Sequence, residues 1–170
     1  PAEAATSKKQ ATKGKARPVS KAEKRIEPRA EAQDADDLLL KSSAVVVQDQ
    51  SSGEVLFEKN SDAVLPIASI TKLMTAMVVL DAQLPLNEVL SIGAEDVDTL
   101  KGTASRLKVG AQLPREDMLL LALMASENRA ASALSRHYPG GAAAFVAAMN
   151  RKAEAIGLSD TRFSDPTGLT

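Results

Sequence analysis

The stretch from 66 to 80 constrains the fold of this chain more than any other. It reads Pro-Ile-Ala-Ser-Ile-Thr-Lys-Leu-Met-Thr-Ala-Met-Val-Val-Leu. Its large apolar residues recur at helical spacing, which predicts a helix with a buried apolar face. These residues are Leu73, Met74, Met77, Val78 and Leu80. Near the start, Ser69 and Lys72 form an S-x-x-K motif. Residues three apart on a helix are neighbours, roughly 5–6 Å apart at Cβ, so the hydroxyl and the amine share a face.

This spacing has a catalytic and a structural interpretation. A serine hydroxyl becomes a good nucleophile only when a base takes its proton, and Lys72 can be that base only when neutral. About one ordinary lysine in 2,500 is neutral at pH 7, so burial or positive neighbours must lower its pKa. The start of the helix would add a positive end and free N–H groups beside Ser69. In the structural alternative, Ser69 caps the helix and Lys72 is solvated.

A second candidate motif follows the segment Arg115–Ala125, whose run of Leu, Ala and Met predicts a helix buried on most sides. Directly after it come Ser126, Glu127 and Asn128, an S-x-N triplet. A short turn between two buried helices can project Ser126 and Asn128 into a cleft. Ordinary capping of the next helix by Ser126 or Asn128 is the structural alternative.

Other segments predict further elements of regular structure. Ala44–Val47 is a candidate buried strand, and the turn Ser51–Gly53 joins it to a second strand, Glu54–Glu58, as a β-hairpin. Residues 87–114 are predicted to be irregular, with short extended pieces around 89–90 and 107–110.

Two more helices are predicted near the C-terminus. One spans Arg129–Tyr138 and is stopped by Pro-Gly-Gly, and the other spans Ala142–Ile156 with Gly157 as its C-cap. Apolar residues make up 44% of the chain but aromatic residues only 2%, so the core must be aliphatic. The chain has no cysteine and no run of about 18 apolar residues, which excludes disulfides, cysteine metal sites and a predicted transmembrane helix.

Charge is distributed unevenly along the chain. Residues 1–30 hold nine Lys or Arg and three Asp or Glu, a balance of +6, whereas the remainder holds twelve against nineteen, a balance of −7. Residues 1–36 contain almost no large apolar side chain, so we expect a disordered basic tail, dispensable for catalysis, before a folded part spanning 37–170. The tail would act as a solvated tether. Without interleaved aromatic residues, we predict no nucleic-acid partner.

The two motifs together, 57 residues apart from Ser69 to Ser126, resemble those of penicillin-binding proteins and serine β-lactamases. The similarity runs from about residue 44 to 169. It is carried by A-V-V-V-Q-D, S-G-E-V-L-F-E-K-N, P-I-A-S-I-T-K-L-M-T-A-M-V, L-A-L-M-A-S-E-N-R-A-A and D-P-T-G-L. These segments look like low-molecular-mass D-alanyl-D-alanine peptidases. S-E-N-R-A-A and the following Y-P-G-G are most similar to the penicillin-binding protein 7 type, a D,D-endopeptidase of murein.

The resemblance implies a fold, roles and partners. The fold would be the α/β (α+β) penicillin-recognising serine hydrolase fold. Ser69 would attack a D-alanyl carbonyl to form an acyl-enzyme, with its N–H as half of the oxyanion hole, and Lys72 would accept its proton. Ser126 would pass the proton to the leaving amine, and Asn128 would bind the substrate amide and hold Lys72. No metal or organic cofactor is implied. Peptidoglycan peptides would be substrates, β-lactams covalent inhibitors, and the periplasm the location.

One departure from the family pattern is large, because its third motif, K-T-G on a strand, is absent. Lys101, Gly102 and Thr103 hold the same letters in another order, before the second motif, which we interpret as coincidence. We therefore expect an incomplete domain, the first hairpin plus most of the helical region. Either a longer protein or a second chain would supply the other strands, and these residues alone would be inactive.

Alternatives to a peptidase remain open. Class A β-lactamases use a glutamate to activate the deacylating water. No glutamate follows Glu154, and D-P-T-G-L stands where such a loop would be, which favours the peptidase. A non-catalytic cell-wall-binding protein is the alternative from another class. His137 is the only histidine, so a Ser-His-Asp triad would have to use it; we predict a structural or surface histidine instead. The resemblance does not decide between endopeptidase and carboxypeptidase preference.

Overall fold

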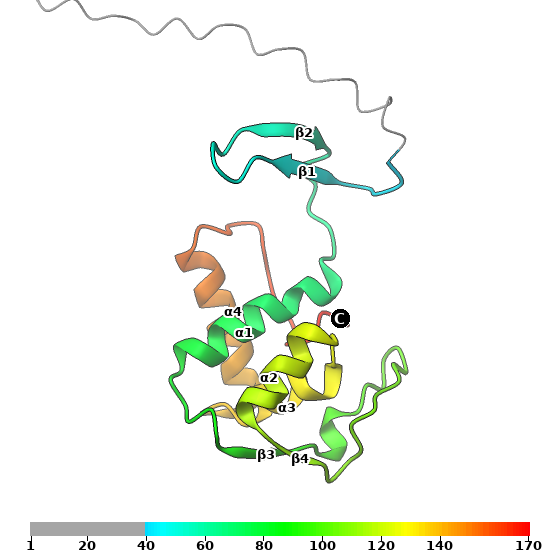
Figure 1. Ribbon diagram of the computed structural model, residues 1–170, viewed down its shortest axis with the longest axis vertical. Coiled ribbons are helices and arrows are strands. Elements are labelled where there is room, and N and C mark those ends of the chain that lie inside the picture. Colours follow the sequence, from blue (N-terminus) through cyan, green and yellow to red (C-terminus); the bar gives the residue numbers. More distant parts are fainter. Residues whose placement is uncertain (1–39) are drawn as a thin grey trace, which may run out of the picture. The chain divides into compact units, whose positions relative to one another are not determined.

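A computed structural model describes residues 40–170 of the chain, which fall into two compact units, one ending at Ser61 and the other beginning at Asp62 (Figure 1). The first unit contains a β-hairpin, and the second contains four helices with a small second hairpin. The predicted tail, residues 1–36, lies outside the described residues and stays a prediction. No helix within 40–170 is long and apolar enough to span a membrane.

The first unit confirms the predicted hairpin. Strands β1 (Val45–Gln48) and β2 (Val55–Lys59) pair antiparallel. The Asp49 carboxylate holds the turn between them by accepting hydrogen bonds from two consecutive backbone N–H groups at 2.9 and 2.7 Å. The prediction that β1 is buried is wrong, because Val46 is 55% exposed. A two-stranded sheet cannot cover both of its own faces.

The second unit confirms the three helices predicted from the later part of the chain and the one that carries Lys72. Its helices are α1 (Thr71–Asp81), α2 (Arg115–Met124), α3 (Asn128–Arg136) and α4 (Gly141–Ala155). Two 3-10 turns are η2 (Ala68–Ile70) and η3 (Ala94–Asp96). Gly157 ends α4 as predicted: it adopts a φ of +82°, and its N–H donates to the Glu154 carbonyl at 3.1 Å.

The core of this unit is aliphatic, as the composition predicts. It combines Met74, Val78 and Val79 of α1, Met118 and Ala122 of α2, Leu134 of α3 and Phe145 and Met149 of α4. Three fully buried alanines, Ala130, Ala131 and Ala133, form much of the inner surface of α3. Their small side chains let α3 pack closely against α1, α2 and α4.

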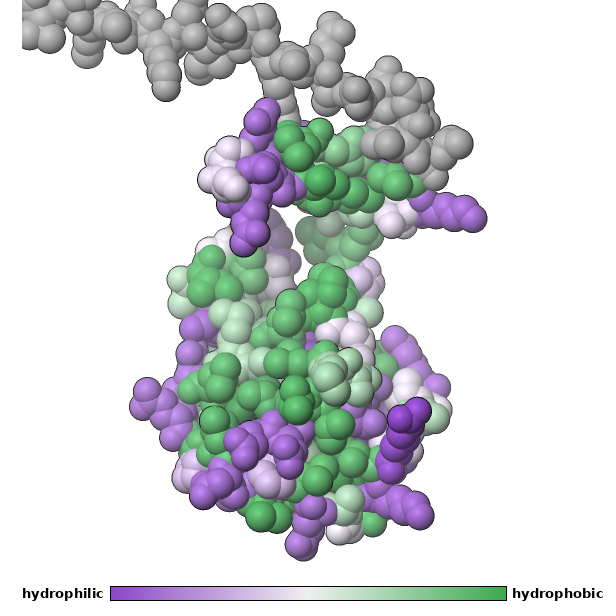
Figure 2. Space-filling model, in the orientation of Figure 1, coloured by the Kyte–Doolittle hydropathy of each residue, from purple (hydrophilic) through white to green (hydrophobic). Residues whose placement is uncertain are grey.

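The prediction that α2 is buried on most sides is wrong. Only Arg115, Met118 and Ala122 of this helix are buried, whereas Leu120, Leu123 and Met124 are exposed, the last to 75%. Leu73 and Leu80 of α1 are also exposed, although both were expected on its buried face. Figure 2 shows apolar side chains gathered on the face of this unit where α1 and α2 lie.

A short hairpin and a long loop separate α1 from α2. Strands β3 (Val89–Ser91) and β4 (Gln112–Pro114) pair antiparallel, with Leu90 opposite Leu113. The extended piece expected around 107–110 is therefore displaced by a few residues along the chain. Gly110 adopts a left-handed φ of +88°, which interrupts an extended backbone there. The loop between β3 and β4 carries η3 and reaches the second motif.

Candidate active site

The residues of the S-x-x-K motif lie together at the junction of η2 and α1. Ser69 lies in η2 and is exposed, whereas Lys72, in the first turn of α1, is only 2% exposed. The Lys72 Nζ donates a hydrogen bond to Ser69 Oγ at 3.1 Å. The structural alternative is wrong for both residues, because Lys72 is not solvated and Ile70 is the N-cap of α1. The exposed Ser69 hydroxyl is thus hydrogen-bonded to the buried Lys72 amine.

The segment D-P-T-G, residues 165–168, fixes this helix start from the other end of the chain. Lys72 Nζ donates a second hydrogen bond, to the Thr167 carbonyl at 3.0 Å. One turn further along α1, the fully buried Thr75 hydroxyl donates to the Pro166 carbonyl at 2.7 Å. The carbonyls of Pro166 and Thr167 therefore accept hydrogen bonds from Thr75 and Lys72, which lie on one face of α1. Lys72 Nζ itself is positioned by two contacts, with Ser69 Oγ and with the Thr167 carbonyl.

Gly168 packs directly against the backbone that precedes Ser69. A Cβ placed on Gly168 would lie 1.9 Å from the Ala68 carbonyl oxygen, and its φ of +80° independently favours glycine. Ala68 itself has a φ of +46°, which is unusual for a residue with a side chain. Such conformations cost about 1–3 kcal/mol, persist only where surrounding structure enforces them, and cluster at active sites.

Asp165 holds the D-P-T-G segment in shape. Its carboxylate accepts hydrogen bonds from the N–H groups of Thr167, Gly168 and Thr170 at 2.6, 2.8 and 3.1 Å, and from both threonine hydroxyls. Burial by itself would raise the pKa of Asp165, but these hydrogen bonds stabilise the anion and keep its pKa well below the usual range. The aspartate therefore remains charged while it organises the turn.

The second motif forms the turn between α2 and α3. Ser126 is exposed and has a left-handed φ of +54°. Neither predicted capping residue caps α3; the Glu127 side chain does so by accepting from the Arg129 N–H at 3.2 Å. Asn128 begins α3, and its Nδ2 donates to Thr103 Oγ1 at 3.1 Å. Asn128 Oδ1 is buried without a hydrogen-bond partner among residues 40–170.

A hollow of about 210 Å³ lies where the second motif meets the D-P-T-G segment. Asn128 lines it from α3, Asp165 and Thr167 from the C-terminal segment, and Asp98 and Leu100 from the loop between β3 and β4. Thr167, through its carbonyl, also contacts Lys72. Of the four predicted site residues only Asn128 lines the hollow; Ser69, Lys72 and Ser126 do not, and Lys72 is linked to it only through the Thr167 carbonyl.

Comparison with known proteins places this geometry in a family. Residues 29–170 match the family model described as D-alanyl-D-alanine carboxypeptidase. The chain belongs to the D-alanyl-D-alanine carboxypeptidase family. Over 131 residues, 77% of the chain, it is 58% identical to a D-alanyl-D-alanine endopeptidase of Pseudomonas aeruginosa. It is 51% identical to one of Escherichia coli over 76% of the chain. In each case the match covers 42% of the relative's length.

A solved structure shows the same fold. The ampicillin-bound form of penicillin-binding protein D2 from Listeria monocytogenes superposes with a TM-score of 0.64 at 34% identity. The match covers 78% of this chain and 54% of that one. The predicted penicillin-binding protein fold and the predicted family are confirmed. The resemblance that predicted this family rested on the two motifs together with the longer segments around them, from about residue 44 to 169.

Electrostatics at Lys72 differ in part from what the sequence predicts. Burial lowers the pKa of Lys72 below its ordinary value of 10.5, as a proton acceptor requires. Its charged neighbours, however, are not cations. Asp165 and Glu127 are anionic, and both stabilise the ammonium form and oppose the shift. Burial is therefore the effect that favours the neutral amine, in competition with two nearby carboxylates.

Some residues of the site were missed from the sequence. Thr103 contacts Asn128, although the letters of Lys101, Gly102 and Thr103 do not form the family's third motif. Asp165 carried a readable signal, since an Asp directly before Pro in a turn typically hydrogen-bonds nearby backbone N–H groups. The contact of the Thr167 carbonyl with Lys72 could not be predicted from the sequence, because every residue has a backbone carbonyl.

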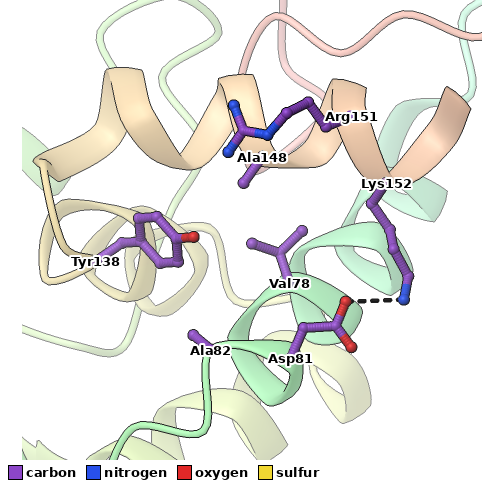
Figure 3. Close-up of a pocket in the computed structure, with 7 residues that line it drawn as sticks. All are labelled: Val78, Asp81, Ala82, Tyr138, Ala148, Arg151 and Lys152. Atoms are coloured by element: carbon purple, nitrogen blue, oxygen red, sulfur yellow. Dashed lines mark ion pairs between the residues drawn. The ribbon is translucent and has the colours of Figure 1, made fainter. Parts of the chain in front are cut away.

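Another hollow, of about 250 Å³, lies away from these residues (Figure 3). It is lined by Val78 and Asp81 of α1, Arg151 and Lys152 of α4, and Tyr138 after α3. Lys152 and Asp81 form an ion pair at 2.8 Å within it. Its lining contains none of the predicted site residues and no serine. No cluster of three His, Cys, Asp or Glu is placed to hold a metal within the described part of the chain.

Proposed function

We propose that this chain carries the nucleophile and base of a serine peptidase that cleaves D-alanyl peptide bonds in peptidoglycan through an acyl-enzyme. The observation that supports this most directly is the contact of the buried Lys72 Nζ with the exposed Ser69 Oγ at 3.1 Å. A buried amine with a lowered pKa beside an accessible hydroxyl is the arrangement that general-base activation of serine requires.

In the proposed reaction, neutral Lys72 accepts the hydroxyl proton as Ser69 Oγ bonds to the D-alanyl carbonyl carbon. The carbonyl oxygen becomes an oxyanion, and the Ser69 N–H, in the 3-10 turn η2 that precedes α1, donates to it. The C–N bond then breaks, and the proton returns from Lys72 to the departing amine by way of the Ser126 hydroxyl. Water hydrolyses the resulting ester and regenerates Ser69. Asn128 binds the substrate amide.

β-Lactams would acylate the same serine, and the reaction would take place in the periplasm, where peptidoglycan is accessible. The similar proteins of Pseudomonas aeruginosa and Escherichia coli are named endopeptidases, which supports cleavage of cross-links rather than removal of terminal D-alanine. A non-catalytic wall-binding protein would retain the motifs without being acylated, so acylation decides between these two functions.

The test is to incubate the complete gene product with a fluorescent penicillin and to map the adduct by mass spectrometry. We expect the label on the peptide that contains Ser69. Ser69→Ala should abolish labelling and reduce peptide turnover by about a million-fold, the effect of removing such a nucleophile. A label on Ser126, or no label on the folded wild-type protein, would overturn the proposal.

A second measurement addresses the bond cleaved. Purified cross-linked muropeptide dimers and monomeric pentapeptides are offered separately, and the products are separated by chromatography. We expect faster conversion of dimers to monomers than release of free D-alanine from pentapeptides. The reverse preference would assign a carboxypeptidase, and rapid hydrolysis of the penicillin itself would assign a β-lactamase.

A further inference from the structure

The hollow of about 250 Å³ at the far end of α1 combines polar groups from three parts of the second unit (Figure 3). Asp81 is the last residue of α1, Tyr138 lies between α3 and α4, and Arg151 and Lys152 belong to α4. The buried Val78 adds an apolar part to the lining. The volume is many times what one water molecule needs, so a carboxyl group fits inside.

Within residues 40–170, the Arg151 guanidinium is the one charged group of this hollow without a partner. Lys152 pairs with Asp81 at 2.8 Å, and this pair offsets two of the three charges in the lining. One positive charge therefore remains, on Arg151. A guanidinium is planar and presents several N–H donors, so it binds a carboxylate through two parallel hydrogen bonds.

Tyr138 adds a hydroxyl whose position is fixed by the core. Its ring packs edge-on against the fully buried Phe145, with ring centroids 5.2 Å apart and the ring planes at 81°. Figure 3 shows the hydroxyl end of Tyr138 pointing into the hollow. This hydroxyl makes no hydrogen bond among the described residues, so it can donate one to a ligand. A donor oriented in advance loses little freedom when the ligand binds.

The hollow is separated from the first motif by a length that a peptide can span. Lys72 and Asp81 are nine positions apart on α1, which is about 14 Å along the helix axis at 1.5 Å per residue. An extended chain of four or five residues covers about that length. A peptidoglycan strand with one peptide at Ser69 can therefore also reach the hollow, whereas a molecule as small as benzylpenicillin cannot.

We propose that this hollow is a second binding site for peptidoglycan, in which Arg151 and Tyr138 hold a free carboxylate of a stem peptide. The inference rests on the proposed function, because that function supplies the polymer and its peptide carboxylates. Arg151 forms an ion pair with the carboxylate, and Tyr138 donates a hydrogen bond to it. Residues 40–170 hold twelve Lys or Arg and fifteen Asp or Glu, a net charge of −3, so attraction of an anionic polymer to this part of the chain has to be local.

The test is binding to purified peptidoglycan sacculi, measured by co-sedimentation over a range of sacculus concentrations. Every variant is made in the complete gene product carrying Ser69→Ala, so that no bond is cleaved during the assay. Arg151→Gln removes the charge, and Tyr138→Phe removes the hydroxyl but keeps the ring against Phe145. Arg162→Gln is the matched control, because Arg162 is exposed, lies outside the hollow and changes the net charge equally.

We expect Arg151→Gln to weaken binding by about fivefold, the upper range for one exposed ion pair. Tyr138→Phe should weaken binding by about twofold, as for the loss of one hydrogen bond, and Arg162→Gln should leave it unchanged. On sacculi whose carboxyl groups have been converted to amides, Arg151→Gln and its parent should bind equally. Equal binding of Arg151→Gln and Arg162→Gln to untreated sacculi, or a loss in Arg151→Gln that persists on amidated sacculi, would overturn the site.

Acylation by benzylpenicillin, measured in the same variants with Ser69 intact, tests the proposed function separately. It should proceed at the wild-type rate in all of them, which also shows that they are folded. If the folded wild-type protein is not acylated, the proposed function is overturned, while weaker binding of Arg151→Gln than of Arg162→Gln still supports a carboxylate site. If Ser69 is acylated and that difference in binding is absent, the site is overturned and the proposed function stands.

Discussion

The two motifs of the site are held in different ways. The first motif is tied to the interior: Lys72 and Thr75 are buried and bonded to carbonyls 95 and 91 positions later in the chain. The second motif lies on a turn with an exposed serine, and its asparagine is held by a loop residue 25 positions earlier. The difference follows from the chemistry. A base must be desolvated to lose its proton near neutral pH, whereas groups that meet a substrate must remain reachable.

Among the variants that test this difference between the two motifs, Lys72→Arg is expected to reduce the rate of acylation most. Arginine keeps the charge but stays protonated in proteins, so it cannot accept the Ser69 proton. Acylation should fall by about a million-fold, as when the nucleophile or base of a similar site is removed. The measurement is the rate of penicillin labelling in the complete gene product.

The matched control is Lys152→Arg on α4. Lys152 pairs with Asp81 at 2.8 Å, and arginine can form the same ion pair, so this variant should be acylated at the wild-type rate. If Lys72→Arg were labelled as fast as Lys152→Arg, the base would have to be another group, and burial of Lys72 would have only structural importance.

Gly168→Ala should disrupt the first motif without touching either of its side chains. The new Cβ would meet the Ala68 carbonyl at 1.9 Å, and that carbonyl belongs to the residue before Ser69, the proposed nucleophile. We expect acylation to fall by about 100-fold, because displacement of Ser69 by about 1 Å has that effect. Chemical denaturation should show a loss of stability as well.

Gly157→Ala separates the backbone effect from the displacement of Ser69. Its φ of +82° matches that of Gly168, but nothing lies within 4 Å of the added Cβ. This variant should lose stability by about 1–2 kcal/mol from the left-handed backbone alone and keep its acylation rate. Equal acylation rates in the two variants would show that the contact between Gly168 and Ala68 does not position Ser69.

Glu127→Gln should change the rate of acylation least. It tests the electrostatic interaction between Glu127 of the second motif and Lys72 of the first. The Glu127 anion stabilises the Lys72 ammonium, so removing its charge should lower the pKa of Lys72 further. Acylation requires the neutral amine and therefore rises as pH increases through this pKa. The rising limb of the pH–rate profile should move to lower pH, and acylation at neutral pH should increase slightly.

Glutamine keeps the oxygen that caps α3 by accepting from the Arg129 N–H, so the helix start is preserved. Glu116→Gln on the exposed side of α2 serves as the control and should leave the profile unchanged. A shift of the limb to higher pH in Glu127→Gln would contradict the assigned sign of the interaction.

Several features of this protein could be predicted from the sequence because they depend on local geometry. Ser69 and Lys72 are three residues apart, and the helical spacing predicted their contact, which forms although Ser69 lies in the 3-10 turn η2 just before α1. The stop of α4 at Gly157 and the first hairpin follow from local turn and capping chemistry. The family could be predicted because the two motifs and the longer segments around them are each contiguous in the sequence.

Burial was predicted wrongly from the sequence in segments whose apolar residues show no periodic pattern. The run of leucines in α2 has apolar residues on every side, so composition suggested a buried helix, while only Met118 and Ala122 among its apolar residues are buried. In the described structure, the packing of α2 against α3 and α1 decides which side faces inward. Burial of β1 was overestimated for a similar reason, because its consecutive valines do not reveal which face is covered.

Only the tertiary structure decided how the site is completed. It brings the Thr167 carbonyl to Lys72, the Gly168 backbone to Ala68, and Thr103 to Asn128. These contacts join segments from 25 to 100 positions apart, and two of them use backbone atoms that every residue possesses. Side-chain identity and spacing can predict which groups are capable of chemistry. The packing of the helices and loops determines which of those groups are buried, oriented and paired.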